Sequence, residues 1–122
     1  MQPVFSSGSA IVLGVTYGTP TDVGAGDLRD IHVYPGPAAP PNDRERAGVL
    51  GEFGGLGLPV QGHTWDEKSW GYRGVSDSEA LTRAYEGLLR RVYELAQDEG
   101  LCAAIYTQLT DVESECNGLI TY

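Results

Sequence analysis

The residue with the clearest chemical potential is Glu52, which lies in the run Val49-Leu50-Gly51-Glu52-Phe53-Gly54-Gly55. This pattern is typical of a short buried strand that ends on a carboxylate and opens into glycines. Burying an acid costs free energy unless the acid is paired or has a chemical task. Glycines beside it allow a ligand or another backbone to approach closely. Glu52 is therefore a candidate reactive group. The structural alternative is an ion pair with Arg44, Arg46 or Arg73.

Two other apolar runs end on polar or aromatic residues. Ile31-His32-Val33-Tyr34 stops at Pro35, and Leu101 to Tyr106 leads into Thr107 and Gln108. In barrels of parallel strands the chemistry sits where strands end. An imidazole, a phenol, a carboxylate and an amide are thus expected at one rim, beside a loop over 54–75 that carries two tryptophans.

The elements that must position these residues are predicted as strands near 31–34, 48–53 and 101–107 and a helix near 77–99. The helix prediction starts from Ser76 as the cap, with Glu79 reaching back to it in a capping box. It ends at Gly100, a natural C-terminal stop. Its apolar side chains recur at helical spacing and form one stripe: Leu81, Tyr85, Leu88, Leu89, Val92 and Leu95.

The unbroken apolar run at 101–106 predicts a strand buried on both faces, and it makes Cys102 a buried free thiol. Strand, connection, strand, loop, helix, strand is βαβ order, which gives a parallel sheet. We therefore expect an α/β fold with three to four parallel strands and one long helix. Residues 1–20 form a divergent segment in which Ala10 to Val15 is a candidate extra strand.

Composition limits the class of protein. The chain has 122 residues, typical of one domain, and a formal charge of −9. Nucleic acids and anionic membranes require clustered basic residues, so neither is an expected partner. No run reaches the roughly 20 apolar residues of a membrane span, and the first ten residues lack a basic signal region. A cytoplasmic protein is the default expectation. Metal-ligand spacings and phosphate-binding motifs are missing, so no metal or cofactor is expected.

Several short motifs then occur in a fixed order along the chain: TDVGAGD at 21–27, DIHVYPGP at 30–37, LGEFGGLG at 50–57, GHTW at 62–65, WGY at 70–72, AIYTQ at 104–108, DVE at 111–113 and NGL at 117–119. Over residues 21–122 the chain resembles the C-terminal part of the catalytic barrel of glycoside hydrolase family 2, the β-galactosidase and β-glucuronidase family. The resemblance implies a truncated (β/α)8 barrel whose three strands correspond to the sixth, seventh and eighth. It also implies that Glu52 is the catalytic nucleophile.

That role suits a carboxylate, because retaining glycosidases use an ionised acid to attack the anomeric carbon. The resemblance implies a carbohydrate substrate. Tryptophan faces suit sugar C–H surfaces, and polar side chains suit sugar hydroxyls; each of these residues also has a structural alternative, in pinning the loop or filling the core. The candidate substrate-binding residues are His32, Tyr34, Trp65, Trp70 and Gln108.

The departures from this family are as informative as the matches. The family's acid/base Glu belongs to an Asn-Glu pair after the fourth strand, and this chain has no such dipeptide. Asp111 and Glu113 are the first candidates for a replacement proton donor, Glu67 is the next, and a carboxylate of a second copy is the last. A full barrel takes about 250 residues, so 122 residues form roughly half.

Half a barrel leaves open edges and an uncovered apolar face, which favours a homo-oligomer. Three interpretations stay open at this point. They are a shortened retaining β-glycosidase, a non-catalytic carbohydrate-binding protein, and an inactive barrel fragment stabilised by self-association.

Overall fold

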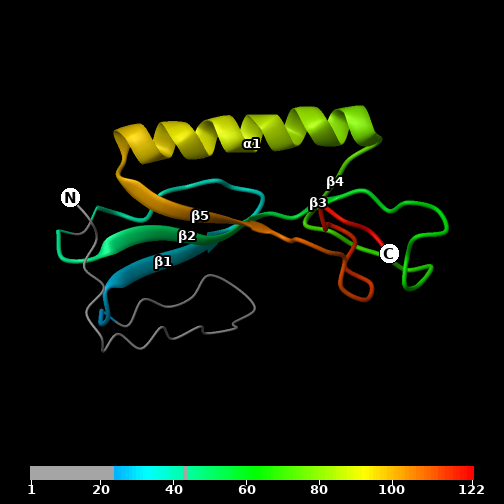
Figure 1. The fold of residues 1–122 in the computed structure, drawn as a ribbon, viewed down its shortest axis with the longest axis horizontal. Helices are drawn as coiled ribbons and strands as arrows, with labels where there is room; N and C mark the ends of the chain where they lie inside the picture. Colours follow the sequence, from blue (N-terminus) through cyan, green and yellow to red (C-terminus); the bar gives the residue numbers. More distant parts are fainter. Residues whose placement is uncertain (1–23, 43) are drawn as a thin grey trace.

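A three-stranded parallel sheet forms the centre of the protein (Figure 1). The computed structural model describes residues 24–42 and 44–122, so the predicted strand at 10–15 lies outside the described residues. The sheet contains β1 (Leu28–Val33), β2 (Ala47–Gly54) and β5 (Leu101–Thr107), in the order β1-β2-β5. Parallel strands in an α/β fold are confirmed; β1 starts at Leu28 rather than at Ile31.

One long helix, α1 (Ser78–Asp98), lies along one face of this sheet and connects β2 to β5 through βαβ order (Figure 1). The helix is confirmed, but its predicted cap is wrong. Asp77 is the N-cap, and its Oδ1 accepts the Ala80 N–H at 2.8 Å. Ser76 Oγ instead donates to Asp77 Oδ2 at 2.6 Å. An ionised carboxylate accepts this backbone N–H more strongly than a neutral hydroxyl does, so the aspartate takes the capping position.

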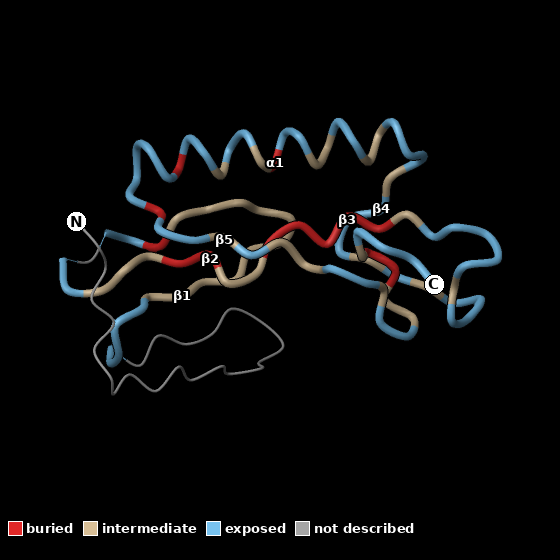
Figure 2. The backbone as a smooth tube through the Cα atoms, viewed as in Figure 1, coloured by how far each residue is buried: buried red, intermediate tan, exposed pale blue. Residues whose placement is uncertain are grey.

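The core lies between α1 and the sheet, and it continues from β2 into β3 (Figure 2). Leu50 and Phe53 of β2 are 0% and 2% exposed, and Leu95 of α1 is 1% exposed. The apolar stripe predicted for the helix supplies this contact, since its two buried residues, Leu88 and Leu95, belong to the same cluster. Burial of these side chains is what fixes the helix on the sheet.

The prediction that β5 is buried on both faces is wrong. Leu101 is 6% exposed, but Cys102, Ala103 and Ile105 are exposed. The reason is that β5 is an outer strand of the described sheet and α1 covers only one of its faces. The buried thiol is that of Cys116, at 2% exposure, in the C-terminal loop. Burial raises the pKa of the Cys116 thiol, and the nearby Asp111 carboxylate adds to this effect.

Beyond the carboxyl ends of the strands, the loops 58–72 and 108–122 gather at one end of the molecule (Figure 1). A second, two-stranded parallel sheet of β3 (Leu56–Gly57) and β4 (Arg73–Gly74) joins this region to the core. Backbone bonds link the two loops, because Trp70 N–H donates to the carbonyl of Ser114 at 2.8 Å and Cys116 N–H donates to that of Trp70 at 2.8 Å.

The helix–sheet contact predicts the effect of a cavity at Leu95. Leu95→Ala is expected to lower the free energy of unfolding by about 2–5 kcal/mol, because a fully buried side chain is truncated. Gln97→Ala, an exposed change on the same helix, should alter it by less than about 0.5 kcal/mol. Chemical denaturation followed by circular dichroism measures both, and equal effects would contradict this packing.

Candidate functional site

The register of the sheet places Glu52 beside His32. These two residues are Cα partners across β1 and β2, whereas one step earlier Ile31 pairs with Leu50. Gly51 is therefore an extra residue in β2, a bulge that re-aims the following side chain. Paired residues of neighbouring strands face the same side of a sheet, so the bulge brings the imidazole and the carboxylate together.

Tyr34 holds the same carboxylate from the end of β1. Its hydroxyl donates to Glu52 Oε2 at 2.5 Å, and its oxygen lies 3.0 Å from Thr107 Oγ1 at the end of β5. A phenol has a single proton, so the threonine hydroxyl is the donor in the second bond. Burial raises the pKa of the Tyr34 phenol well above its usual range, and the hydrogen bond to Glu52 raises it further. Tyr34 is therefore a neutral donor to Glu52.

His32 lies between two carboxylates. Its Nε2 is 3.2 Å from Asp30 Oδ2, and its Nδ1 is 3.4 Å from Glu52 Oε2. An ionised carboxylate only accepts hydrogen bonds, so the proton of this first contact is carried by Nε2. The His32 side chain is 10% exposed, against 40% for Asp30 and 43% for Glu52. The imidazole is thus the most enclosed of the three groups.

The glycines around Glu52 make room for side chains of the protein itself. Gly51 N–H donates to Asp30 Oδ1 at 2.8 Å, and a Cβ at Gly51 would overlap this carboxylate. Gly54 has a φ of 96° and faces the ring of Tyr106, which a Cβ would also meet. The sequence pattern therefore did mark a close approach, and the approaching groups are Asp30 and Tyr106.

The alternative of an arginine partner for Glu52 is wrong. Across residues 24–42 and 44–122, its ion-pair and hydrogen-bond partners are His32 and Tyr34, and both contact Oε2. With a side chain that is 43% exposed, Glu52 is neither sealed in the core nor neutralised by a guanidinium.

Aromatic rings extend from this carboxylate into the loop 58–72. Tyr34 stacks on Tyr72 with ring centroids 3.6 Å apart, and Trp70 meets Tyr72 edge-on at 5.4 Å. Trp70 thus belongs to a row of rings that leads to Glu52. Trp65 does not belong to this row, because its ring tilts against Tyr122 with a centroid distance of 6.1 Å.

Gln108, a predicted substrate-binding residue, is engaged within the protein. Its Nε2 donates to Asn117 Oδ1 at 2.8 Å, and Asn117 Nδ2 donates to Glu115 Oε1 at 3.0 Å. Asn117 is 1% exposed. This buried amide chain holds the C-terminal loop against the end of β5, which is a structural task.

The three candidate proton donors lie in the loops. Asp111 Oδ1 accepts the Gly118 N–H at 2.7 Å and so closes a turn. Glu113 is exposed, has a positive φ of 52°, and its N–H donates to the Tyr122 hydroxyl at 2.7 Å. Glu67 is also exposed. The contacts of Asp111 and Glu113 are with loop residues, and none of the three candidates belongs to the hydrogen-bonded group around Glu52 among the described residues.

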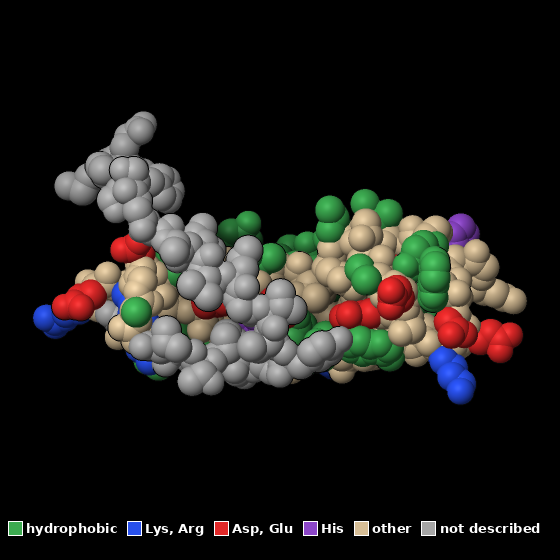
Figure 3. All heavy atoms as spheres, turned by 90° about the horizontal axis from the view of Figure 1, so that it is seen from below, with side chains coloured by type: hydrophobic (Ala, Val, Ile, Leu, Met, Phe, Trp, Pro, Cys, Tyr) green, Lys and Arg blue, Asp and Glu red, His purple; other side chains and the backbone are tan. Residues whose placement is uncertain are grey.

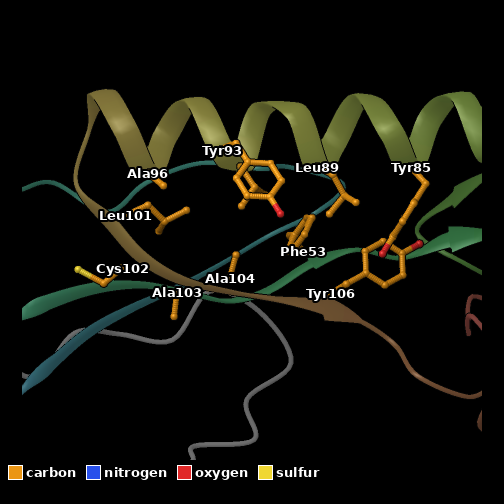
Figure 4. A pocket seen from close by; sticks show the side chains of 11 residues that line it. Phe53, Tyr85, Leu89, Tyr93, Ala96, Leu101, Cys102, Ala103, Ala104 and Tyr106 are labelled. Atoms are coloured by element: carbon orange, nitrogen blue, oxygen red, sulfur yellow. The ribbon is translucent and has the colours of Figure 1, made fainter. Parts of the chain in front are cut away.

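A cavity of about 380 Å³ lies elsewhere, between α1 and β5 (Figure 4). Apolar and aromatic side chains line it, including Phe53, Leu89, Leu101 and Tyr106, and several of these belong to or pack on the core cluster. Glu52 is not among its lining residues. This cavity lies where α1 leaves part of the outer strand β5 uncovered.

Exposed apolar side chains gather over the end that carries the loops, with acidic side chains between them (Figure 3). Lys and Arg side chains are seen at the two extremities of this face. The exposed apolar side chains of the loop 108–122 include Leu109 at 68%, Ile120 at 57% and Leu119 at 54% exposure.

Sequence reasoning missed three residues of the site: Asp30, Tyr72 and Thr107. Asp30 had a detectable signal, because it lies two positions before His32 in a strand and such residues share a face. Thr107 was named only as a strand end, and its hydroxyl contact follows from the pairing of Gly54 with Thr107. Tyr72 had no local signal, since its stacking depends on how the loop 58–72 returns to β3.

Comparisons with known proteins do not assign the chain to a family. No protein-family profile matches the chain, and no curated protein matches it. Among the described residues, no helix is long and apolar enough to cross a membrane. In the same residues, no group of three or more His, Cys, Asp or Glu side chains is placed to hold a metal ion.

The environment of Tyr34 predicts its behaviour in alkali. A raised pKa means that the phenol stays protonated above pH 10, where an ordinary tyrosine ionises. The phenolate absorbance that develops near pH 10 should therefore be equal in the wild type and in Tyr34→Phe. Ultraviolet titration measures it, within the range where circular dichroism shows an intact fold. A smaller phenolate absorbance near pH 10 in Tyr34→Phe than in the wild type would contradict the hydrogen-bonded geometry.

Proposed function

We propose that this protein provides the nucleophile of a retaining β-glycosidase and that Glu52 is that nucleophile. The observation that supports this most directly is that the two oxygens of the Glu52 carboxylate have different surroundings. Tyr34 and His32 both contact Oε2, and within the described residues Oε1 has no such partner. The hydrogen bond from Tyr34 withdraws negative charge from Oε2 and fixes the orientation of the carboxylate. In this proposal Oε1 is the oxygen that attacks.

The proposed fold is the last part of a (β/α)8 barrel. Three observations support it: the strands are parallel, they are neighbours in chain order, and α1 crosses from β2 to β5. The site also lies at the carboxyl ends of the strands, where barrels of this kind place their chemistry. In this proposal β1, β2 and β5 correspond to the sixth, seventh and eighth barrel strands.

The proposed reaction starts with attack of Glu52 Oε1 on the anomeric carbon of a β-glycoside. The bond from that carbon to the leaving oxygen breaks, the electron pair departs with the oxygen, and a glycosyl ester forms on Glu52. Water then cleaves the ester and restores the carboxylate. A retaining enzyme also places a protonated acid about 5–5.5 Å from the nucleophile.

The three candidate proton donors lie in the loops: Asp111, Glu113 and Glu67. We therefore propose that the proton for the leaving oxygen comes from a second copy or another chain. An aryl leaving group with a very acidic phenol departs without protonation. Such a substrate tests the nucleophile by itself.

A second candidate is carbohydrate binding without turnover. Trp65 is 69% exposed and Trp70 is 43% exposed, and flat apolar faces in solvent suit sugar rings. In this function Glu52 and His32 bind hydroxyl groups, and no covalent intermediate forms.

The decisive test is covalent labelling. Wild-type protein is incubated with 2,4-dinitrophenyl 2-deoxy-2-fluoro-β-glycosides of the gluco, galacto and manno series and with the corresponding glucuronide. We expect release of one equivalent of dinitrophenolate and the added mass of one fluorosugar on the peptide that contains Glu52. Glu52→Gln should not be labelled, because an amide is not an effective nucleophile.

Glu113→Gln is the matched control, and it should be labelled at the wild-type rate if Glu113 has no part in this step. Saturable binding of a sugar without labelling would establish the second candidate. If the protein shows neither labelling nor binding, the inactive barrel fragment is the correct interpretation.

We also propose that copies of the chain associate through the outer edge of β5. Ile105 is 58% exposed there, and Cys102 and Ala103 are exposed beside it. Uncharged outer strands pair readily with other chains.

Sedimentation velocity is expected to show an increase in mass with protein concentration. Ile105→Lys should shift the protein towards the monomer, because a charge on the edge strand opposes pairing. Val60→Lys, a change at a residue that is 40% exposed in a loop, should have no effect. A monomer at every concentration would contradict this proposal.

A further inference from the structure

Asp30 contacts both the backbone and the ring beside Glu52. Its Oδ1 accepts the N–H of Gly51, the residue before the carboxylate, at 2.8 Å. Its Oδ2 lies 3.2 Å from His32 Nε2. No contact joins Asp30 to Glu52 directly among the described residues, so the contacts between them run through these two groups.

We infer that Asp30 is a positioning residue which fixes the reactive carboxylate through His32 and through the bulge at Gly51. This inference rests on the proposed function for its kinetic consequence, but the positioning itself is a property of the folded protein.

The first part of the argument concerns the ring. An imidazole on a strand retains freedom about its second side-chain torsion unless a partner fixes it. The Asp30 carboxylate holds Nε2, which leaves Nδ1 directed towards Glu52 Oε2 at 3.4 Å. When the ring is protonated, this contact is an ion pair, and it adds to the bond from Tyr34 on the same oxygen.

The second part concerns the backbone. The bulge gives β2 one residue more than β1 between Leu50 and Glu52, and the extra residue leaves its N–H outside the regular ladder. Asp30 Oδ1 accepts that N–H. The same side chain that closes the bulge also orients the ring, so removal of Asp30 weakens both the bulge and the ring contact.

The kinetic consequence follows from geometry. A displacement of about 1 Å at a reacting group can reduce its rate about 100-fold. Asp30→Ala and His32→Ala are each expected to slow the labelling of Glu52 by about 100-fold, with little change in the apparent dissociation constant of the fluoroglycoside. Because loss of Asp30 also removes the support of the His32 ring, the double variant should be less than about tenfold slower than Asp30→Ala alone, well short of the product of the two single effects. Asp98→Ala, an exposed change at the end of α1, is the control for loss of an acid.

A second readout does not require catalysis. The side-chain carboxyl carbon of Glu52 is followed by NMR at neutral pH and assigned by its loss in Glu52→Gln. We expect Asp30→Ala to shift this resonance in the wild-type background and to shift it much less in the His32→Ala background. If Asp30→Ala does not fold, Asp30→Asn takes its place, since the amide keeps an acceptor for Gly51 and removes the charge.

The outcomes separate the two proposals. If the wild type is not labelled by any probe, the glycosidase proposal fails, and the NMR cycle alone decides whether Asp30 positions Glu52. Independent, additive effects of Asp30 and His32 would overturn the inference, as would an Asp30→Ala variant with an unchanged Glu52 resonance. A reduced effect in the His32→Ala background would establish it.

Discussion

The structure around the candidate site depends on how a carboxylate is kept at the end of the central strand. An acid in this position loses part of its hydration, and the neighbouring hydrogen-bond donors must replace it. Here the phenol of Tyr34 donates to Oε2 of Glu52, and the ring of His32 lies 3.4 Å from the same oxygen. His32 lies in β1 and Tyr34 directly follows it, so the pairing of β1 with β2 determines whether the carboxylate is stabilised. The extra residue at Gly51 sets this pairing one step out of regular register.

The sheet and the helix could be predicted from the sequence because each has a local cause. The apolar stripe of α1 and the runs of β2 and β5 identify buried surfaces, and the boundaries differ from the predicted ones by a few residues at most. The errors arose where two local signals compete or where burial depends on neighbours. Asp77 replaced Ser76 as the helix cap, and β5 is exposed on one side because its position at the edge is a property of the whole sheet.

The candidate site was predictable in part for the same reason. His32, Tyr34 and Glu52 come together because strand ends of a parallel sheet meet at one rim. The bond of Gln108 to Asn117 could not be predicted, since this buried partner lies in a loop whose path no local pattern reveals. The identity of the proton donor is likewise undetermined by sequence, because Asp111, Glu113 and Glu67 are placed by loop geometry rather than by strand register.

The stacking of Tyr72 on Tyr34 connects the stability of a loop to the site itself. Tyr72 precedes β4, which contains two residues, and backbone bonds from Arg73 to Gly55 and from Val75 to Gly57, at 3.2 and 3.0 Å, hold this segment against β3. Segments with so few bonds open locally at a lower free-energy cost than the core strands. Each such opening removes the ring that covers Tyr34 and admits water to its hydroxyl. The surroundings of the bond from Tyr34 to Glu52 therefore depend on a short segment outside the central sheet.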